Sequence, residues 1–382
     1  MLGKNVSPRI QKLENDFIRN GGCFKEYKIE DLFRNLKVSL KLSKLDISEE
    51  FTFPVYSSDT SNGGIYGYSN FAEFIVDDEN ESYLIFGDHT RTFNIARQSF
   101  AVMDNVKVLK PLLKYWSDES LLYVATIWKK QIPNYGYSRH WKYAKSCLLK
   151  LPSYNDELAF DYMESYIREL EQERIRELDA YLRATGLNDY ELTPEEEKCI
   201  KFMQSGGVKY KEFKIGELFD IRKGKRLTKA DQTSGFTPFI GSTDSNNGLT
   251  GYIGQSPIFN SPAITVNYNG SVGKSFYQEY DFWASDDVNV LYLKNHILSD
   301  LLYGYFGTVF EKSSKKYSYA FKWNLERMKE SLIVIPVDLN GNIDYDFMTS
   351  FIKAIQKQCI RPVVEWKERV IETTKFLVGE NA

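Results

Sequence analysis

The sequence is poor in the residues that build cross-linked or metal-bound domains. Its four cysteines lie far apart, at Cys23, Cys147, Cys199 and Cys359, and form no CxxC pair, while only three histidines occur in 382 residues. This spacing excludes a dense disulfide framework and a zinc site of the usual kind. We therefore expect the chain to hold no metal ion and to bind no cofactor of its own.

Long apolar runs are also missing. No run approaches the roughly 18 residues that a membrane-spanning helix needs, and residues 1–10 lack the apolar core of a secretory signal. The sequence therefore predicts a protein without a membrane segment, located in the cytoplasm.

An excess of positive charge is absent, since the formal net charge is −3. Without a global basic field, any binding of nucleic acid has to use local basic patches or charge supplied by a partner.

Catalytic motifs are absent as well. The segment 270–275 has only two residues between its glycines, where a phosphate-binding loop has four, so it predicts a tight turn. The carboxylate-x-Lys fragment in 193–198 is better explained as a helix cap, and the sequence contains no GxGxxG and no nucleophile elbow. These absences predict a protein that is not an enzyme.

What the sequence does contain is a tandem repeat. Segments 24–33 and 210–219 are identical at six of ten positions, at an offset of 186 residues. Segments 54–68 and 238–252 match at an offset of 184, and later blocks match at 182 and 185. Collinear matches through the whole chain indicate a duplication, so two halves with the same fold are expected.

Each half reads as a short helix, a strand-rich block and a long helix. Ser7-Pro8 and Thr193-Pro194 have the form of helix N-caps followed by proline, and the strand-rich blocks span 24–152 and 210–336. The shared Asp104 and Asp286 fall at strand starts, where a structural hydrogen bond to the backbone is expected.

The long helices are predicted at 157–186 and 344–376 from apolar residues at helical spacing, and about thirty residues form a rod roughly 45 Å long. Such stripes favour pairing with a partner helix, with packing against the helix's own domain as the alternative. The residues expected to make these contacts are Met163, Ile167, Leu170, Leu178, Phe351, Ile355, Val363 and Val370.

Two stretches in each half combine the charges and rings that suit a nucleic-acid groove. In the second half, five cations fall within eight residues around Gly224, which we expect to allow close approach to a phosphate backbone; they are Arg222, Lys223, Lys225, Arg226 and Lys229. The weaker counterpart in the first half holds Lys37, Lys41 and Lys44.

The second stretch comes late in each half, where Trp141 and Trp323 are either groove residues or core anchors. Its candidate DNA-binding residues are Tyr137, Arg139, His140 and Lys142 in the first half and Lys315, Lys316 and Tyr319 in the second. Polar loops and turns add further candidates able to contact base edges, although turn chemistry alone also explains them. These candidates are Ser58, Asn62, Arg91, Thr243, Asn246, Asn247, Tyr268 and Asn269.

Residues 213–225, continued by 236–248 and by the Trp-Ala-Ser-Asp-Asp-Val run at 283–288, resemble the opening of target recognition domains in the specificity subunits of type I restriction-modification systems. The duplicated plan of domain and helix covers nearly the whole chain and is the specific part of the resemblance.

The resemblance implies a mixed α/β fold in which two pseudo-symmetric target recognition domains are separated by long antiparallel coiled-coil helices. We expect a first recognition domain at 1–152, a central helical region at 153–192, a second recognition domain at 193–336 and a C-terminal helical region at 337–382. Each domain would read one half of a split site on double-stranded DNA.

The helices would set the spacer and dock one or two methyltransferase subunits. Those subunits would bind S-adenosylmethionine, and a restriction subunit would join through the complex. The segment 335–343 departs from the type I pattern and looks more like the specificity subunits of type IIB systems, so the system type stays open. The alternative from a different class is a duplicated carbohydrate- or protein-binding module.

Overall fold

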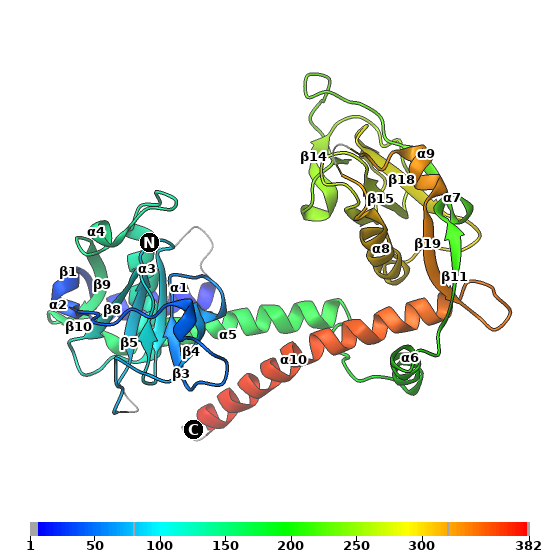
Figure 1. Ribbon diagram of the computed structural model, residues 1–382. Coiled ribbons are helices and arrows are strands. Elements are labelled where there is room, and N and C mark those ends of the chain that lie inside the picture. The colour runs from blue at the N-terminus through cyan, green and yellow to red at the C-terminus, as the bar shows by residue number, and fades with distance from the viewer. Residues whose placement is uncertain (1–6, 79–80, 319–320, 380–382) are drawn as a thin grey trace. The chain divides into compact units, whose positions relative to one another are not determined.

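The computed structural model describes residues 7–78, 81–318 and 321–379, with side chains up to residue 371. The chain divides into two compact units, Met1–Ala180 and Tyr181–Ala382, which are called the first and second unit below. In each unit a strand-rich body leads into a long helix, α5 or α10 (Figure 1).

The first unit opens with helix α1 (Pro8–Arg19), which Ser7 caps with its side chain as predicted. Its three sheets have the strand orders β1-β9-β10, β2-β8-β5-β6 and β4-β3-β7. The strands are β1 (Cys23–Lys28), β2 (Phe33–Leu36), β3 (Phe53–Tyr56), β4 (Ile65–Ser69), β5 (Tyr83–Gly87), β6 (Thr92–Ala96), β7 (Ala101–Val102), β8 (Val106–Pro111), β9 (Leu148–Tyr154) and β10 (Glu157–Leu158). The remaining helices are α2 (Ile29–Leu32), α3 (Asp118–Gln131), α4 (Trp141–Ala144) and α5 (Phe160–Ala184), with 3-10 turns η1 (Lys44–Asp46) and η2 (Asn62–Gly64).

The second unit opens with helix α6 (Pro194–Gln204), where Thr193 and Glu196 form the predicted capping box. Its sheets have the orders β11-β19, β12-β18-β15-β16 and β14-β13-β17. The strands are β11 (Lys209–Lys214), β12 (Phe219–Lys223), β13 (Thr237–Ile240), β14 (Leu249–Ile253), β15 (Ala263–Asn267), β16 (Ser275–Gln278), β17 (Trp283–Ala284), β18 (Val288–Leu293) and β19 (Leu332–Val337). The other helices are α7 (Ile215–Leu218), α8 (Asp300–Ser314), α9 (Leu325–Glu330) and α10 (Tyr345–Gly379), with the 3-10 turn η3 (Asn246–Gly248).

The two units repeat the same sheet plan except that β10 has no counterpart strand in the second unit, so the duplication predicted from the sequence is confirmed as a duplication of fold. The agreement extends to register. Phe24 pairs with Pro152 across β1 and β9, and Tyr210 pairs with Pro336 across β11 and β19. Each strand-rich block therefore begins and ends on neighbouring strands, which closes it as a module.

The cores are built from aromatic and branched side chains. Trp323 is fully buried and donates its indole N–H to Ser331 Oγ at 2.9 Å. Trp141 packs partly buried on the core around Trp128. Both tryptophans shared by the halves are therefore core anchors, and the alternative that they line a groove is wrong.

The domain limits differ from those expected. The limit at 152/153 falls inside β9, and the first turns of α5 bury Met163 and Ile167 in the core of the first unit. In the same way, Met348 of α10 belongs to the core of the second unit. The first turns of each long helix therefore belong to a recognition domain, because their apolar side chains complete the core of that domain. The rest of the helix extends beyond the core.

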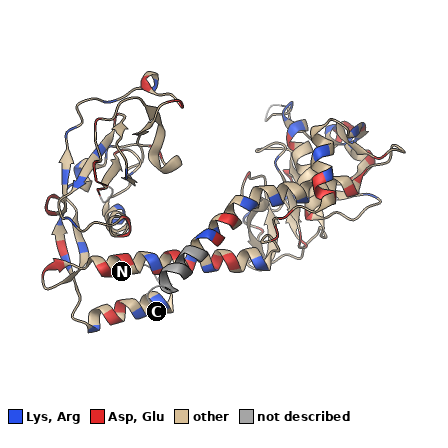
Figure 2. Cartoon of the chain, turned by 90° about the horizontal axis from the view of Figure 1, so that it is seen from below, with Lys and Arg blue, Asp and Glu red and all other residues tan. Residues whose placement is uncertain are grey.

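Beyond these first turns, charged residues of both signs alternate along the long helices (Figure 2). None of the helices in the described part of the chain combines the length and apolar character that a bilayer-crossing segment needs. Whether α5 and α10 pair as an antiparallel coiled coil stays a prediction.

Candidate nucleic-acid interface

The basic loop of the second unit, residues 222–229, leaves β12 and runs along β17. The Gly224 N–H donates to Val288 O and the Lys225 N–H to Ala284 O, both at 2.9 Å. The Trp283 indole N–H donates to Lys225 O, also at 2.9 Å. These bonds fix the backbone of the loop against the body of the domain.

Gly224 has a role different from the one predicted. A Cβ atom at this position would lie 1.9 Å from Ser285 O. The glycine is required because the loop packs against the domain's own backbone, and the predicted close approach to a phosphate backbone is not its reason.

Three of the five loop cations lie over aromatic rings of the same unit. Arg222 lies 4.8 Å from the ring centroid of Tyr292, Lys223 lies 5.5 Å from that of Tyr268, and Lys225 lies 5.8 Å from that of Trp283. All three cations remain exposed to solvent. The rings hold the charged groups in place while these stay accessible to solvent, which suits contact with phosphates. Tyr292 was missed as a functional residue because its place in a strand gave no such signal.

Ion pairs connect the basic loop of each unit to the turn that precedes β8 in the first unit and β18 in the second. Arg226 lies 3.6 Å from Asp286, and in the first unit Lys41 lies 2.5 Å from Asp104. The Lys41 hydrogen bond, followed by the Asn105 backbone N–H, holds the pKa of Asp104 below its usual range. For both aspartates we predicted a structural hydrogen bond to the backbone. That prediction is incomplete, since each carboxylate also forms an ion pair with a loop cation.

The second unit brings four of the predicted segments together at this turn. The Tyr268 hydroxyl donates to Asp286 O, and Asn269 Nδ2 donates to Asp287 Oδ1 at 2.8 Å. Asn267 Nδ2 donates to Thr243 O at 2.7 Å. Residues from 222–229, 242–248, 267–269 and 286–287 thus share one surface.

The asparagines of the polar loops stabilise turns. Asn62 and Asn246 each have positive φ and donate their side-chain amide to the carbonyl oxygen three residues on, at 3.2 and 3.1 Å. Asn247 also has positive φ and donates to Tyr277 O at 2.9 Å. Turn chemistry accounts for these residues, and contact with base edges stays a prediction.

In the first unit, two predicted contact residues turn out to be internal. His140 is fully buried; its Nδ1 donates to Asp88 O at 2.9 Å and its Nε2 accepts from the Tyr135 N–H at 3.2 Å. Arg91 donates to Ile132 O at 3.0 Å. Both residues hold the loop 132–141 in place, so His140 is removed from the set of DNA contacts and Arg91 is assigned a supporting role.

The outward side of that loop carries Tyr137 and Arg139, both exposed. Lys142 follows with its ammonium 4.7 Å from the ring centroid of Tyr143. Arg139 also lowers the pKa of Asp104, after the larger effects of Lys41 and the backbone. The loop is therefore close enough to the Lys41–Asp104 pair for Arg139 to act on it electrostatically.

The remaining candidates are peripheral. Lys37 and Lys44 are exposed, and Lys44 lies 5.7 Å from the ring centroid of Tyr66. Lys315 and Lys316 are exposed where α8 ends. Tyr319 lies outside the described residues.

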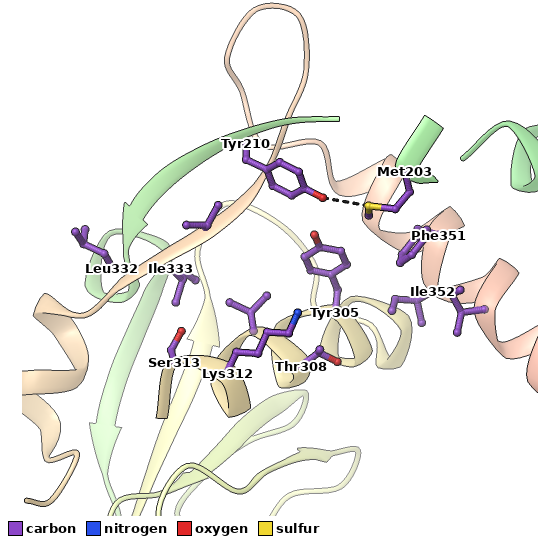
Figure 3. A pocket seen from close by; sticks show the side chains of 13 residues that line it. Met203, Tyr210, Tyr305, Thr308, Lys312, Ser313, Leu332, Ile333, Phe351 and Ile352 are labelled. Carbon is purple, nitrogen blue, oxygen red and sulfur yellow. Dashed lines mark hydrogen bonds between the residues drawn. The ribbon is translucent and has the colours of Figure 1, made fainter. Parts of the chain in front are cut away.

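The helix residues predicted for packing differ in burial. Met163 and Ile167 are buried, Leu170, Leu178 and Val370 are half-buried, and Val363 is 38% exposed. Phe351 and Ile355 instead line an apolar groove of about 790 Å³ between α6, α8, β19 and α10 (Figure 3).

In the first unit the opening helix α1 packs on the start of α5 through an aromatic side chain. Phe17 of α1 is 3% exposed and packs on Tyr162 at a ring-centroid distance of 4.2 Å. In the second unit the corresponding side chain is Met203, and Tyr210 and Val334 remain 45% and 48% exposed in the groove. The groove of the second unit is thus an apolar surface with exposed side chains.

An ionic contact explains why α6 docks differently from α1. Glu196 takes the place of the buried Ile10 and lies 3.2 Å from Lys357 of α10. Lys357 also lies 2.9 Å from Asp189 and donates to Glu191 O at 2.7 Å. Burial raises the pKa of Glu196, but the Thr193 N–H and Lys357 together lower it further than burial raises it.

Replacing Lys357 by Met should lower the free energy of unfolding of the second unit by about 1–3 kcal/mol, because the buried carboxylate loses its partner. The stabilisation is present above the ordinary Glu196 pKa of 4.5 and is lost as the pH falls through the lower folded value. Urea denaturation of both proteins at neutral and acid pH measures the difference, which should shrink in acid. The control is Lys353→Met, since Lys353 is 53% exposed and lies 3.7 Å from Glu196. An equal loss in that variant would contradict the assignment.

Comparison with known proteins gives consistent matches. Residues 207–363 match the family described as Type I restriction modification DNA specificity domain. A type II restriction enzyme specificity subunit, S.BcgI of Heyndrickxia coagulans, is 30% identical over 303 residues, covering 77% of this chain and 85% of that protein. The type I restriction enzyme MpnII specificity subunit of Mycoplasma pneumoniae is 31% identical over 109 residues, 28% of this chain and 32% of its own length.

The fold agrees with a solved structure. The crystal structure of the type I restriction-modification system S subunit from M. genitalium superposes with a TM-score of 0.59 at 15% identity, over 94% of both chains.

Proposed function

Because this chain belongs to the family of specificity subunits of restriction-modification systems, we propose that its two recognition domains each read one half of a split DNA sequence. The observation that supports this reading most is the repeat of one fold with a basic loop and a carboxylate-bearing turn at the same place in each copy. Two copies of one reading surface suit a site made of two half-sites.

The chain is the specificity subunit and not the catalytic subunit of such a complex. Methyl transfer to adenine, with S-adenosylmethionine as donor, is assigned to a methyltransferase partner, and the complex acts on DNA in the cytoplasm. The alternative of a carbohydrate- or protein-binding module has no support among the relatives, which are specificity subunits.

The extent of the matches bears on the type of system. The type II relative aligns over 303 residues and the type I relative MpnII over 109. The longer match to the type II relative, together with the type IIB resemblance of segment 335–343, favours a type IIB system. In such a system one partner combines methylation and cleavage.

The salt dependence of binding tests the proposed function. The complex with the methyltransferase should bind duplex DNA with an affinity that falls steeply as salt rises, because each neutralised phosphate releases counterions. The chain alone should bind weakly, in line with its net charge of −3. Binding that barely responds to salt, or tight binding to a glycan, would contradict the proposal.

We infer that the open groove of the second unit receives an amphipathic helix of the methyltransferase subunit. The groove is apolar and is bordered by α6, α8 and α10, so the apolar face of a further helix suits it. Lys312 lines the groove, so a helix that carries an acidic residue facing this lysine would be favoured.

Val334→Lys tests this docking, because the repeat carries Lys150 at the same strand position. The variant should fold normally and bind the methyltransferase at least about ten-fold more weakly, since a charge enters an apolar contact. Pull-down titration and calorimetry measure the affinity, and thermal melting verifies the fold. The matched control is Leu339→Lys, at a residue 88% exposed outside the groove. Equal affinity of both variants for the partner would rule out this docking surface.

A further inference from the structure

A two-ring shelf stands on the surface of the first unit. Tyr137 is 88% exposed, and its ring lies parallel to that of His89, with centroids 4.4 Å apart and an interplanar angle of 1°. His89 covers one face of the tyrosine and leaves the other face toward solvent. Covering the apolar face of an aromatic ring is favourable. A tyrosine with one exposed face is therefore suited to stack with another flat ring.

Hydrogen bonds hold His89 and the loop that carries Tyr137. The His89 N–H donates to Ser58 Oγ at 3.1 Å, and His89 Nδ1 donates to Ser138 O at 3.2 Å. Ser138 Oγ donates to Tyr135 O at 2.9 Å, and the buried His140 anchors the end of the loop. Because the shelf is ordered before any ligand arrives, stacking on it costs little conformational entropy.

The charges around the shelf suit a nucleic acid. Arg139 is two residues from Tyr137 and exposed, and Lys142 is exposed on the next turn. These cations can hold phosphates on either side of a base that stacks on the ring.

We propose that the open face of Tyr137 stacks on a nucleobase of the first half-site, with His89 as its positioning residue. In an intact duplex both faces of a base are covered, so the contact requires a base that is unstacked at one step or turned out of the helix. The first domain would therefore read its half-site partly through local opening of the DNA. The inference rests on the proposed function, since it assumes that the first domain contacts DNA.

Fluorescence of 2-aminopurine tests the contact. The full chain with its methyltransferase is bound to duplexes that carry the recognised sequence, with 2-aminopurine at one position at a time through the half-site read by the first domain. One position should change its fluorescence strongly on binding, and Tyr137→Phe should keep that change. Tyr137→Ala should abolish it and weaken binding roughly 5- to 100-fold, the range for loss of one stacked base.

His89 distinguishes positioning from a merely structural role. His89→Ala should reduce the fluorescence change at the same position, and His89→Phe, which restores a ring behind Tyr137, should recover it. The matched control is Tyr115→Ala, at a tyrosine 77% exposed in the same unit, which should behave as wild type.

The outcomes separate the two proposals. If wild-type complex binds the sequence specifically and Tyr137→Ala keeps both the signal and the affinity, the stacking contact is wrong and DNA reading stands. If the wild-type complex shows no sequence-specific binding, the proposed function itself is wrong.

Discussion

Exchanging residues 210–336 for the corresponding segment of another specificity subunit should change one half of the recognised DNA sequence completely and leave the other half unchanged. The reason is structural. Tyr210 and Pro336 pair across β11 and β19, so the segment begins and ends at one place, after α6 and before α10. The reciprocal exchange of 24–152, bounded by the pair of Phe24 and Pro152, should change the opposite half.

Sequencing of methylated bases in DNA from cells that express each chimera measures the outcome. The spacer between the half-sites should keep its length, because the exchanged segments contain neither long helix. A chimera that alters both halves would show that the domains do not read independently.

Replacing Arg222, Lys223, Lys225, Arg226 and Lys229 together by Ala should weaken DNA binding by the complex on the order of 100-fold or more at about 0.1 M salt. The slope of log affinity against log salt should flatten by roughly 0.9 for each phosphate that the loop no longer neutralises. Because Arg222 and Arg226 are already paired with Asp220 and Asp286, the flattening should be smaller than five fully neutralised phosphates would give.

The fall in affinity should be similar for specific and unrelated sequences, since phosphate contacts carry little sequence information. The exception expected within the loop is an arginine that contacts guanine, whose single replacement would cost about 1–3 kcal/mol at one base position. Fluorescence anisotropy across a salt series provides both quantities, and Lys198→Ala with Lys201→Ala on α6 is the control. An unchanged affinity and slope in the five-fold variant would mean that DNA passes elsewhere.

The repeat plan and its helix ends could be predicted from the sequence because they depend on local signals. Ser7 and Thr193 cap helices through their own side chains, and the paired ends of the strand-rich blocks follow from matched segments at a nearly constant offset. Periodicity also placed the long helices within a few residues of α5 and α10.

The interior roles of polar residues could not be predicted, because they depend on contacts distant in sequence. His140 lies in a run of cations and rings that is typical of a binding surface, yet Asp88, 52 residues away, draws it into the core. Gly224 carries the signal of a flexible loop, and only the position of Ser285 shows that it is needed for close packing.

The difference between the two halves was also hidden in the sequence repeat. The change from Ile10 to Glu196 reads as one divergent position among many. Its meaning depends on Lys357, which lies far along the chain on α10 and forms the ionic contact. That contact docks α6 on α10, beside the apolar groove that α6, α8, β19 and α10 border.

The central claim is that this chain selects the DNA sequence on which a methyltransferase acts. The most direct measurement is a map of methylated adenines in the genome of cells that carry the methyltransferase gene, with and without the gene for this chain. The account predicts methylation at a single split sequence of two half-sites and a fixed spacer, present only when this chain is made. The same methylation pattern without the chain, or no methylated sequence with it, would contradict the account.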